Sequence, residues 1–141
     1  MQIDYFNSEG YPDPTQYGAF QNMAKELFAF RPIVYIASPF SGDVAINVEN
    51  ARRYSKYAVD HGFIPVAPHL LYPQFMDDTI EKDRELGMFF GIVLMSKCAE
   101  VWICGGRVSE GMEQEIRTAK KKGYKLRYFD NDMKEVNPYE A

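Results

Sequence analysis

Three short segments of this sequence bring together residue types that bind or transform small polar molecules. Residues 38–43, SPFSGD, supply two hydroxyl groups, an aromatic ring and a flexible backbone. Residues 67–69, APH, supply a histidine, and residues 105–115, GGRVSEGMEQE, supply a hydroxyl group and several carboxylates. Amides and hydroxyl groups at the start of a helix favour anions and sugar hydroxyls, whereas a sheltered carboxylate favours nucleophilic chemistry.

Glu115 is the carboxylate of the third segment that is best placed for chemistry. Ser109 is expected to cap a helix, and Gly111 leaves the first turn of that helix open for a ligand. Glu115 lies beside the apolar stripe of the same helix, so we expect its carboxylate to be partly sheltered. A solvated side chain is the plain alternative for a single helical Glu.

The other two segments also have a purely structural interpretation. Residues 38–43 form an ordinary turn if Asp43 does no more than cap the following helix. His69 is then a hydrogen-bonded histidine of the fold. The sequence contains neither GxGxxG nor GxxxxGK[ST], so it favours neither a dinucleotide site nor a P-loop.

Alternating strands and helices must position these segments. The sequence predicts strands at residues 33–37, 64–67, 101–104 and 125–129, and helices at residues 44–60, 83–97 and 109–122, with a polar loop at 69–82. This order predicts a small three-layer α/β domain, Rossmann-like or flavodoxin-like, with a parallel sheet of four or five strands. Ligands of such sheets bind beyond the carboxyl ends of the strands, where all three segments lie.

Three finer expectations follow from the residues of these elements. The run at 33–37 is apolar throughout, which predicts a strand buried on both faces. Basic and apolar residues alternate at 125–129, which indicates a sheet edge. The helix at 83–97 is apolar on most faces, which predicts deep burial or a subunit contact, and Gly87 and Gly91 would permit close backbone approach.

The part of the chain before residue 32 has a different character. Residues 1–12 indicate an extended arm, and Asp13-Pro14 is a good helix start, followed by helical apolar spacing to about Phe30. We therefore divide the chain into an N-terminal arm and helix at 1–31, an α/β domain at 32–130 and a C-terminal tail at 131–141.

Composition limits the classes of function. The 141 residues, 46% of them hydrophobic, suffice for one domain with its own core. A net charge of -4 argues against binding a nucleic acid polymer, so the basic residues at 117–127 indicate a solvated face rather than a polyanion site. We expect a cytoplasmic protein without membrane contact, because no signal peptide or spanning stretch is present. Cys98 and Cys104 lack CxxC spacing and indicate reduced thiols without a metal site.

Residues 33–129 resemble the nucleoside 2-deoxyribosyltransferase-like family, which includes nucleotide N-glycosidases. The resemblance is carried by VYIASPFSG, by NVENARRYSKYAVDHG leading into FIPVAPH, and by VWICGGRVSEGMEQEIRTAKKKG. The last segment is the most specific, since it places the family's pattern on Gly111, Met112 and Glu115. The resemblance implies that Glu115 is the nucleophile, that Tyr35 hydrogen-bonds its carboxylate and that Phe40 packs on the nucleobase.

The chain departs from the family's pattern at one point. Transferases of this family carry an Asp in the helix before the third strand, where residues 89–91 of this chain are Phe-Phe-Gly. The nearest acids are Asp83 and Glu85, at least one turn earlier. The departure leaves open whether another group protonates the leaving base, whether the substrate lies differently, or whether the chemistry is lost.

The resemblance implies cleavage or transfer at the N-glycosidic bond of a nucleoside or nucleotide, without a cofactor. Glu115 would form a covalent glycosyl intermediate that a second base or water resolves. We expect the helix start and the Tyr35 hydrogen bond to keep Glu115 ionised against the effect of burial. Ser109 and the amides of residues 110–112 are expected to hold a 5′-phosphate. The predicted substrate-binding residues are Ser38, Pro39, Phe40, Ser41, Gly42, His69, Ser109, Gly111 and Met112.

Two further expectations concern partners. A non-catalytic nucleotide-binding or sensing module on the same fold is the alternative to an enzyme, and the missing Asp makes it credible. We also expect a homo-oligomer, a dimer or higher, because the N-terminal helix and the helix with Gly87 and Gly91 both offer apolar surface.

Overall fold

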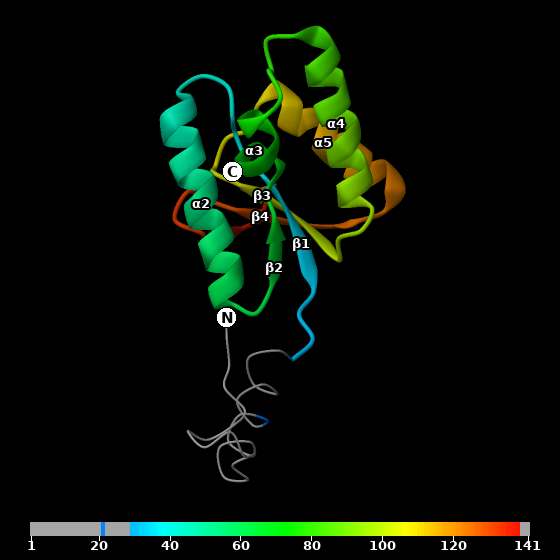
Figure 1. Ribbon diagram of the computed structural model, residues 1–141. Coiled ribbons are helices and arrows are strands. Elements are labelled where there is room, and N and C mark those ends of the chain that lie inside the picture. The colour runs from blue at the N-terminus through cyan, green and yellow to red at the C-terminus, as the bar shows by residue number, and fades with distance from the viewer. Residues whose placement is uncertain (1–20, 22–28, 139–141) are drawn as a thin grey trace, which may run out of the picture. The chain divides into compact units, whose positions relative to one another are not determined.

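The computed structural model of the protein describes residue 21 and residues 29–138 (Figure 1). The chain divides into two compact units, Met1–Arg31 and Pro32–Ala141, and the second unit carries the α/β fold. The predicted arm at 1–12 and nearly all of the predicted helix at 13–30 lie outside the described residues.

The second unit contains a five-stranded sheet of order β2-β1-β3-β4-β5. The first four strands are parallel, and β5 pairs antiparallel with β4. This arrangement confirms the predicted Rossmann-like α/β class. The strands are β1 (Ile33–Ala37), β2 (Ile64–Val66), β3 (Glu100–Cys104), β4 (Lys125–Phe129) and β5 (Glu135–Val136).

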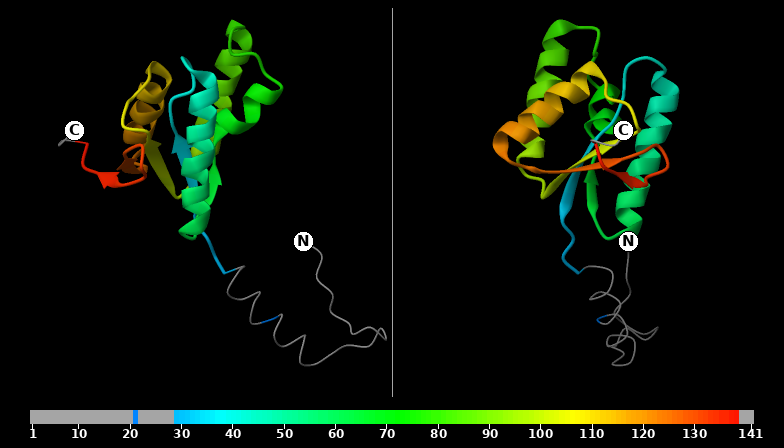
Figure 2. Two further views of the ribbon diagram at one scale, coloured as in Figure 1. Left: turned by 90° about the vertical axis from the view of Figure 1, so that its left-hand side faces the viewer. Right: turned by 180° about the vertical axis from the view of Figure 1, so that it is seen from behind.

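Helices cover both faces of the sheet. α2 lies on one side and α4 and α5 lie on the other, as Figures 1 and 2 show. The helical elements are α2 (Val44–Asp60), α3 (Pro68–Leu71), the 3-10 turn η1 (Tyr72–Gln74), α4 (Glu81–Met95) and α5 (Glu110–Lys122).

β1 is central because its side chains contribute to the hydrophobic core on both faces of the sheet. Val34 and Ile36 join the cluster that faces α2, and Tyr35 and Ala37 join the cluster that faces α4 and α5. Since successive side chains of a strand point to opposite faces, a strand covered on both sides is apolar throughout. The prediction of a doubly buried strand at 33–37 is confirmed.

The sequence signals for helix ends also correspond to real caps. The Asp43 carboxylate accepts a hydrogen bond from the Ile46 amide at 3.2 Å, and the Ser109 hydroxyl accepts one from the Met112 amide at 3.3 Å. Gly123 ends α5 in the left-handed region, at φ 73°. The loops at the carboxyl ends of β1 and β3 therefore lead directly into capped helices.

Three expectations about the elements need correction. The segment 69–82, predicted to be a loop, contains most of α3, all of η1 and the start of α4. α4 buries Gly91 and Met95, while Phe89 is 59% exposed, so deep burial within this chain is wrong. β4 is not the edge strand, because β5 pairs with its last two residues.

Two smaller findings concern the cysteines and membranes. Cys98 and Cys104 are free thiols, and burial raises the pKa of the Cys98 thiol to about 11 and that of the Cys104 thiol to about 12. Among the helices in the described part of the chain, none is long and apolar enough to cross a bilayer.

Candidate active site

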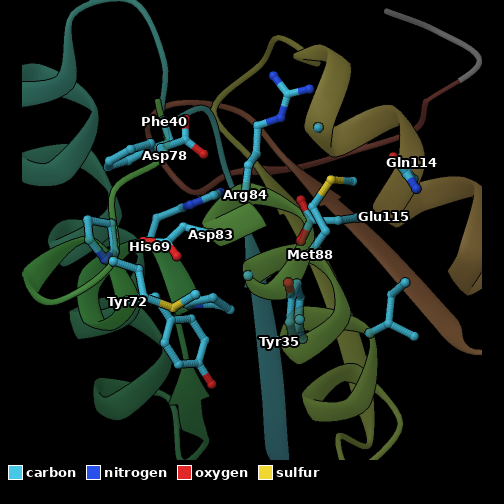
Figure 3. Close-up of a pocket in the computed structure, with 17 residues that line it drawn as sticks. Tyr35, Phe40, His69, Tyr72, Asp78, Asp83, Arg84, Met88, Gln114 and Glu115 are labelled. Carbon is cyan, nitrogen blue, oxygen red and sulfur yellow. The ribbon is translucent and has the colours of Figure 1, made fainter. Parts of the chain in front are cut away.

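A cavity opens between β1, α3, α4 and α5. Its volume is about 120 Å³, and the mouth is open to solvent. Figure 3 shows Phe40, His69 and Tyr72 on one side of the cavity and Tyr35, Met88 and Glu115 on the other. Its lining residues are Tyr35, Phe40, Pro68, His69, Tyr72, Pro73, Met76, Asp78, Asp83, Arg84, Gly87, Met88, Gly91, Ile92, Gly111, Gln114 and Glu115.

Tyr35 and Glu115 form a hydrogen-bonded pair at this cavity. Tyr35 is the middle residue of β1, paired in register with Val66 and Val101, and its side chain is 2% exposed. Its hydroxyl group donates a hydrogen bond to the carboxylate of Glu115 on α5. The strand thus holds a phenol against a partly buried acid that lies one and a half turns into the helix.

Burial dominates the electrostatics of this pair. Desolvation raises the pKa of the Glu115 carboxyl to about 7, although the hydrogen bond from Tyr35 lowers it. The expectation that the helix start and the Tyr35 hydrogen bond would outweigh burial is therefore wrong. Desolvation, followed by the charge of Glu115, also raises the pKa of the Tyr35 hydroxyl well above its usual value, so Tyr35 stays protonated and can donate.

The opposite side of the cavity is aromatic. The rings of Phe40 and His69 stack with centroids 5.0 Å apart and planes 12° apart. Desolvation lowers the pKa of His69, with a smaller opposing effect of the Asp78 charge, so the imidazole is neutral at pH 7. A flat, uncharged stack of this kind can pack against a planar ring of a ligand.

Several cavity residues were not singled out as binding residues by the sequence. Asp78, Arg84 and Gln114 bring charged and polar groups to the cavity, together with Asp83. Asp83 Oδ2 accepts a hydrogen bond from the Asp77 amide at 2.9 Å, which ties the segment before α4 to the helix. The sequence signal available was the polarity of this segment and the position of Asp83 near the site of the missing family Asp.

Asn47 was missed as well, and it positions one of the predicted residues. Its side chain is buried, and its Nδ2 donates to the carbonyl oxygens of Phe40 at 2.9 Å and Ser41 at 3.0 Å. Its Oδ1 accepts from Arg107 Nη2 at 3.4 Å, which links the loops that follow β1 and β3. A buried polar residue early in the helix after a candidate loop was the signal for this role.

The structure brings together five of the predicted site residues, namely Tyr35, Phe40, His69, Gly111 and Glu115. The other predicted residues do not line this cavity. Met112 is 1% exposed and belongs to the core, so its side chain is unavailable to a ligand, which corrects its assignment. The Ser109 hydroxyl caps α5, Ser38 and Pro39 are buried in the loop, and Ser41 and Gly42 are exposed.

The described residues offer little for a metal ion. In residue 21 and residues 29–138, no group of three or more His, Cys, Asp or Glu side chains is arranged to hold one.

Comparisons with known proteins identify a matching family and a solved structure of similar fold. Residues 32–129 match the family described as Domain of unknown function (DUF7768), and no curated protein matches the chain. The chain is similar to the solved structure of a 2-deoxyribosyltransferase from the psychrotolerant bacterium Bacillus psychrosaccharolyticus. The TM-score is 0.59 at 14% identity, over 74% of this chain and 77% of that chain. At that identity the similarity shows the fold alone.

Proposed function

This chain belongs to the family described as Domain of unknown function (DUF7768), and from its cavity we propose that it breaks the N-glycosidic bond of a nucleoside or nucleotide. The observation that carries the proposal is the Glu115 carboxylate, hydrogen-bonded by Tyr35 at a cavity whose other side is an aromatic stack. The 2-deoxyribosyltransferase that shares the fold supports it.

Glu115 acts as the nucleophile in the first step. One carboxylate oxygen attacks the anomeric carbon as the C–N bond breaks, and the electron pair of that bond leaves with the base. The Tyr35 hydroxyl holds the carboxylate in place for this attack, and Phe40 with His69 packs on the base. In the second step, water or another base attacks the same carbon and releases the carboxylate.

The departing base needs a proton, and two carboxyl groups are candidates to deliver it. Asp78 and Asp83 both line the cavity, and we assign this role to one of them in place of the Asp that the deoxyribosyltransferases carry in the helix before the third strand. Asp83 is held by the Asp77 amide, which favours it as the better-positioned of the two. Exchange and hydrolysis share this step and differ only in what resolves the intermediate.

The assay measures release of free base by chromatography. Deoxyribonucleosides, ribonucleosides and their 5′-monophosphates are each incubated with the protein, with and without a second base. An exchanged nucleoside identifies a transferase and free base alone identifies a hydrolase. Because Glu115 must be ionised to attack, the rate is expected to rise with pH through about 7.

Glu115→Gln tests the nucleophile directly. The substitution removes the attacking charge and keeps the shape, so base release is expected to fall by roughly a hundredfold or more. Glu113→Gln, at an exposed position of the same helix outside the cavity lining, is the matched control and should leave the rate within about twofold. A loss of less than about tenfold in Glu115→Gln would contradict the nucleophilic role.

A nucleotide-binding or sensing module is the second candidate, and one observation favours it. Burial raises the pKa of the Glu115 carboxyl to about 7, so the neutral acid, which can donate a hydrogen bond to a bound ligand, is accessible near neutral pH. If wild-type protein binds nucleosides or nucleotides measurably but returns them unchanged, the sensing module replaces the enzyme.

A further inference from the structure

The hydroxyl group of Tyr35 lies against the backbone of α4 at Gly91. A Cβ atom built on Gly91 would lie 2.8 Å from Tyr35 Oη and 3.9 Å from Tyr35 Cζ. The first distance is shorter than any ordinary contact of a Cβ atom, so a side chain at residue 91 would displace the hydroxyl or the helix. Gly87, one turn earlier on α4, has no atom within 4 Å of its built Cβ. The predicted close approach therefore exists at Gly91 and not at Gly87.

The phenol has little freedom to avoid such a contact. Tyr35 is 2% exposed, and its strand is paired on one side with β2 and on the other with β3. The backbone of β1 is thereby fixed, and the ring is packed among Met95, Val101 and the rest of its core cluster. A clash at residue 91 must be relieved either by moving the hydroxyl away from Glu115 or by moving α4 away from the sheet.

We propose that Gly91 is a positioning residue, which leaves room for the Tyr35 hydroxyl so that it can hold the Glu115 carboxylate at the cavity. Its catalytic meaning rests on the proposed function, whereas the geometry that it maintains does not need a substrate. Glycine inside a helix is otherwise unfavourable relative to alanine, so helix stability by itself gives no reason for this residue. The need for space beside the Tyr35 hydroxyl group is a reason for glycine at this position.

Four variants test the proposal: Gly91→Ala, Tyr35→Phe, the two combined, and Gly87→Ala. The first readout is the pKa of Glu115, followed by carbon NMR of carboxyl-labelled glutamate and assigned with Glu115→Gln. Tyr35→Phe removes the hydrogen bond that lowers this pKa, so the pKa should rise. Gly91→Ala should raise it in the same direction, and adding Gly91→Ala to Tyr35→Phe should change it no further.

The second readout is the midpoint of thermal unfolding. Gly91→Ala should lower the midpoint, and Tyr35→Phe should restore part of that loss because the clashing oxygen is gone. Gly87→Ala is the control for the effect of alanine on α4, and it should not lower the midpoint because nothing opposes its Cβ. In the base-release assay, Gly91→Ala should lower kcat about tenfold with little change in KM, as expected for a weakened hydrogen bond to a charged group.

Each outcome decides the proposal. An unchanged Glu115 pKa in Gly91→Ala overturns it, as does an effect that adds fully to that of Tyr35→Phe. If Gly91→Ala fails to fold, recovery of folding in the combined variant supports the proposal, and failure of both variants to fold overturns it in favour of helix packing alone. A wild-type protein that releases no base defeats the proposed enzyme, while the pKa and unfolding results still judge the role of Gly91.

Discussion

Two opposed effects act on the pKa of the Glu115 carboxyl group. Desolvation raises its pKa and the Tyr35 hydrogen bond lowers it, and desolvation prevails because the acid sits beside a core stripe and a largely apolar cavity. A carboxyl group that titrates near neutrality is typical of functional sites, where it changes between nucleophile or base and neutral acid within the working pH range. The same rise in pKa lowers the stability of the folded state as the pH increases.

The pH dependence of stability follows from that shift. The folded pKa of Glu115 is raised from 4.5 to about 7, so between these values the unfolded chain has released a proton that the folded chain retains. The contribution of Glu115 to the free energy of unfolding is therefore most favourable below about pH 4.5. It decreases as pH rises to about 7 and is constant above that. Glu115→Gln removes the penalty, so its stability relative to wild type should rise over the same window, by at most about 3 kcal/mol.

Urea unfolding of both proteins at pH 4, 6 and 8 measures this difference. Glu113→Gln serves as the control, since no comparable change in its stability relative to wild type is expected at an exposed position. A gap between Glu115→Gln and wild type that is the same at all three pH values would show that Glu115 titrates normally.

At the scale of elements, one side chain of α2 connects the loops that follow β1 and β3. Asn47, in the first turn of α2, reaches back to two carbonyl groups of the loop that carries Phe40. Arg107, in the loop after β3, reaches Asn47 in turn. The aromatic side of the cavity thus depends on a buried amide that never enters the cavity.

Asn47→Ala is expected to loosen this loop. The two carbonyl groups lose their donor, which costs about 1–3 kcal/mol when the groups are partly buried, and Phe40 loses its fixed position against His69. Nucleoside binding, measured by calorimetry, should weaken more than about fivefold, while Asn50→Ala, which removes only an exposed contact with Arg53, should leave binding nearly unchanged. Equal affinities of the Asn47→Ala variant and wild type would mean that the loop holds Phe40 without the amide.

At the scale of the whole molecule, the position of the cavity follows from the topology of the sheet. β1 and β3 are neighbours, but α2 after β1 and α5 after β3 pack on opposite faces (Figure 1). The loops after the two strands therefore diverge, and a crevice opens between them, as at the ligand sites of other open α/β sheets. Phe40 comes from one of these loops and Gly111 and Glu115 from the helix after the other, so the cavity draws on both sides of the divergence.

The C-terminal part of the described chain should contribute to stability. Among the described residues, both core clusters are built from residues 34–133, and the C-terminal part supplies Met133, which is 5% exposed, and the β5 pairing. A chain that ends at Asp130 should be destabilised by about 2–5 kcal/mol, because it loses a buried methionine and the hydrogen bonds of the β4–β5 turn. Thermal unfolding followed by circular dichroism checks this, and an unchanged midpoint would contradict the prediction.

Local sequence patterns were enough to predict most of the elements. The bounds of β1 and α2 follow directly from an apolar run and from helical periodicity, and the caps at Asp43 and Ser109 follow from short-range side-chain chemistry. Glu115 and Tyr35 were reached through a family resemblance, and the structure supports their pairing with a hydrogen bond between elements distant in the chain.

The tertiary structure alone decided what surrounds that pair. Asp78 enters the cavity because a segment predicted to be a loop folds back in short helical turns, which hydrophobic periodicity does not encode. Met112, predicted to contact the ligand, is a core residue, and the pKa of Glu115 is raised where it was expected to stay low. Both outcomes depend on burial, which is set by atoms from distant parts of the chain. Spacing along one helix determines which residues share a face, whereas desolvation depends on what the rest of the fold packs against that face.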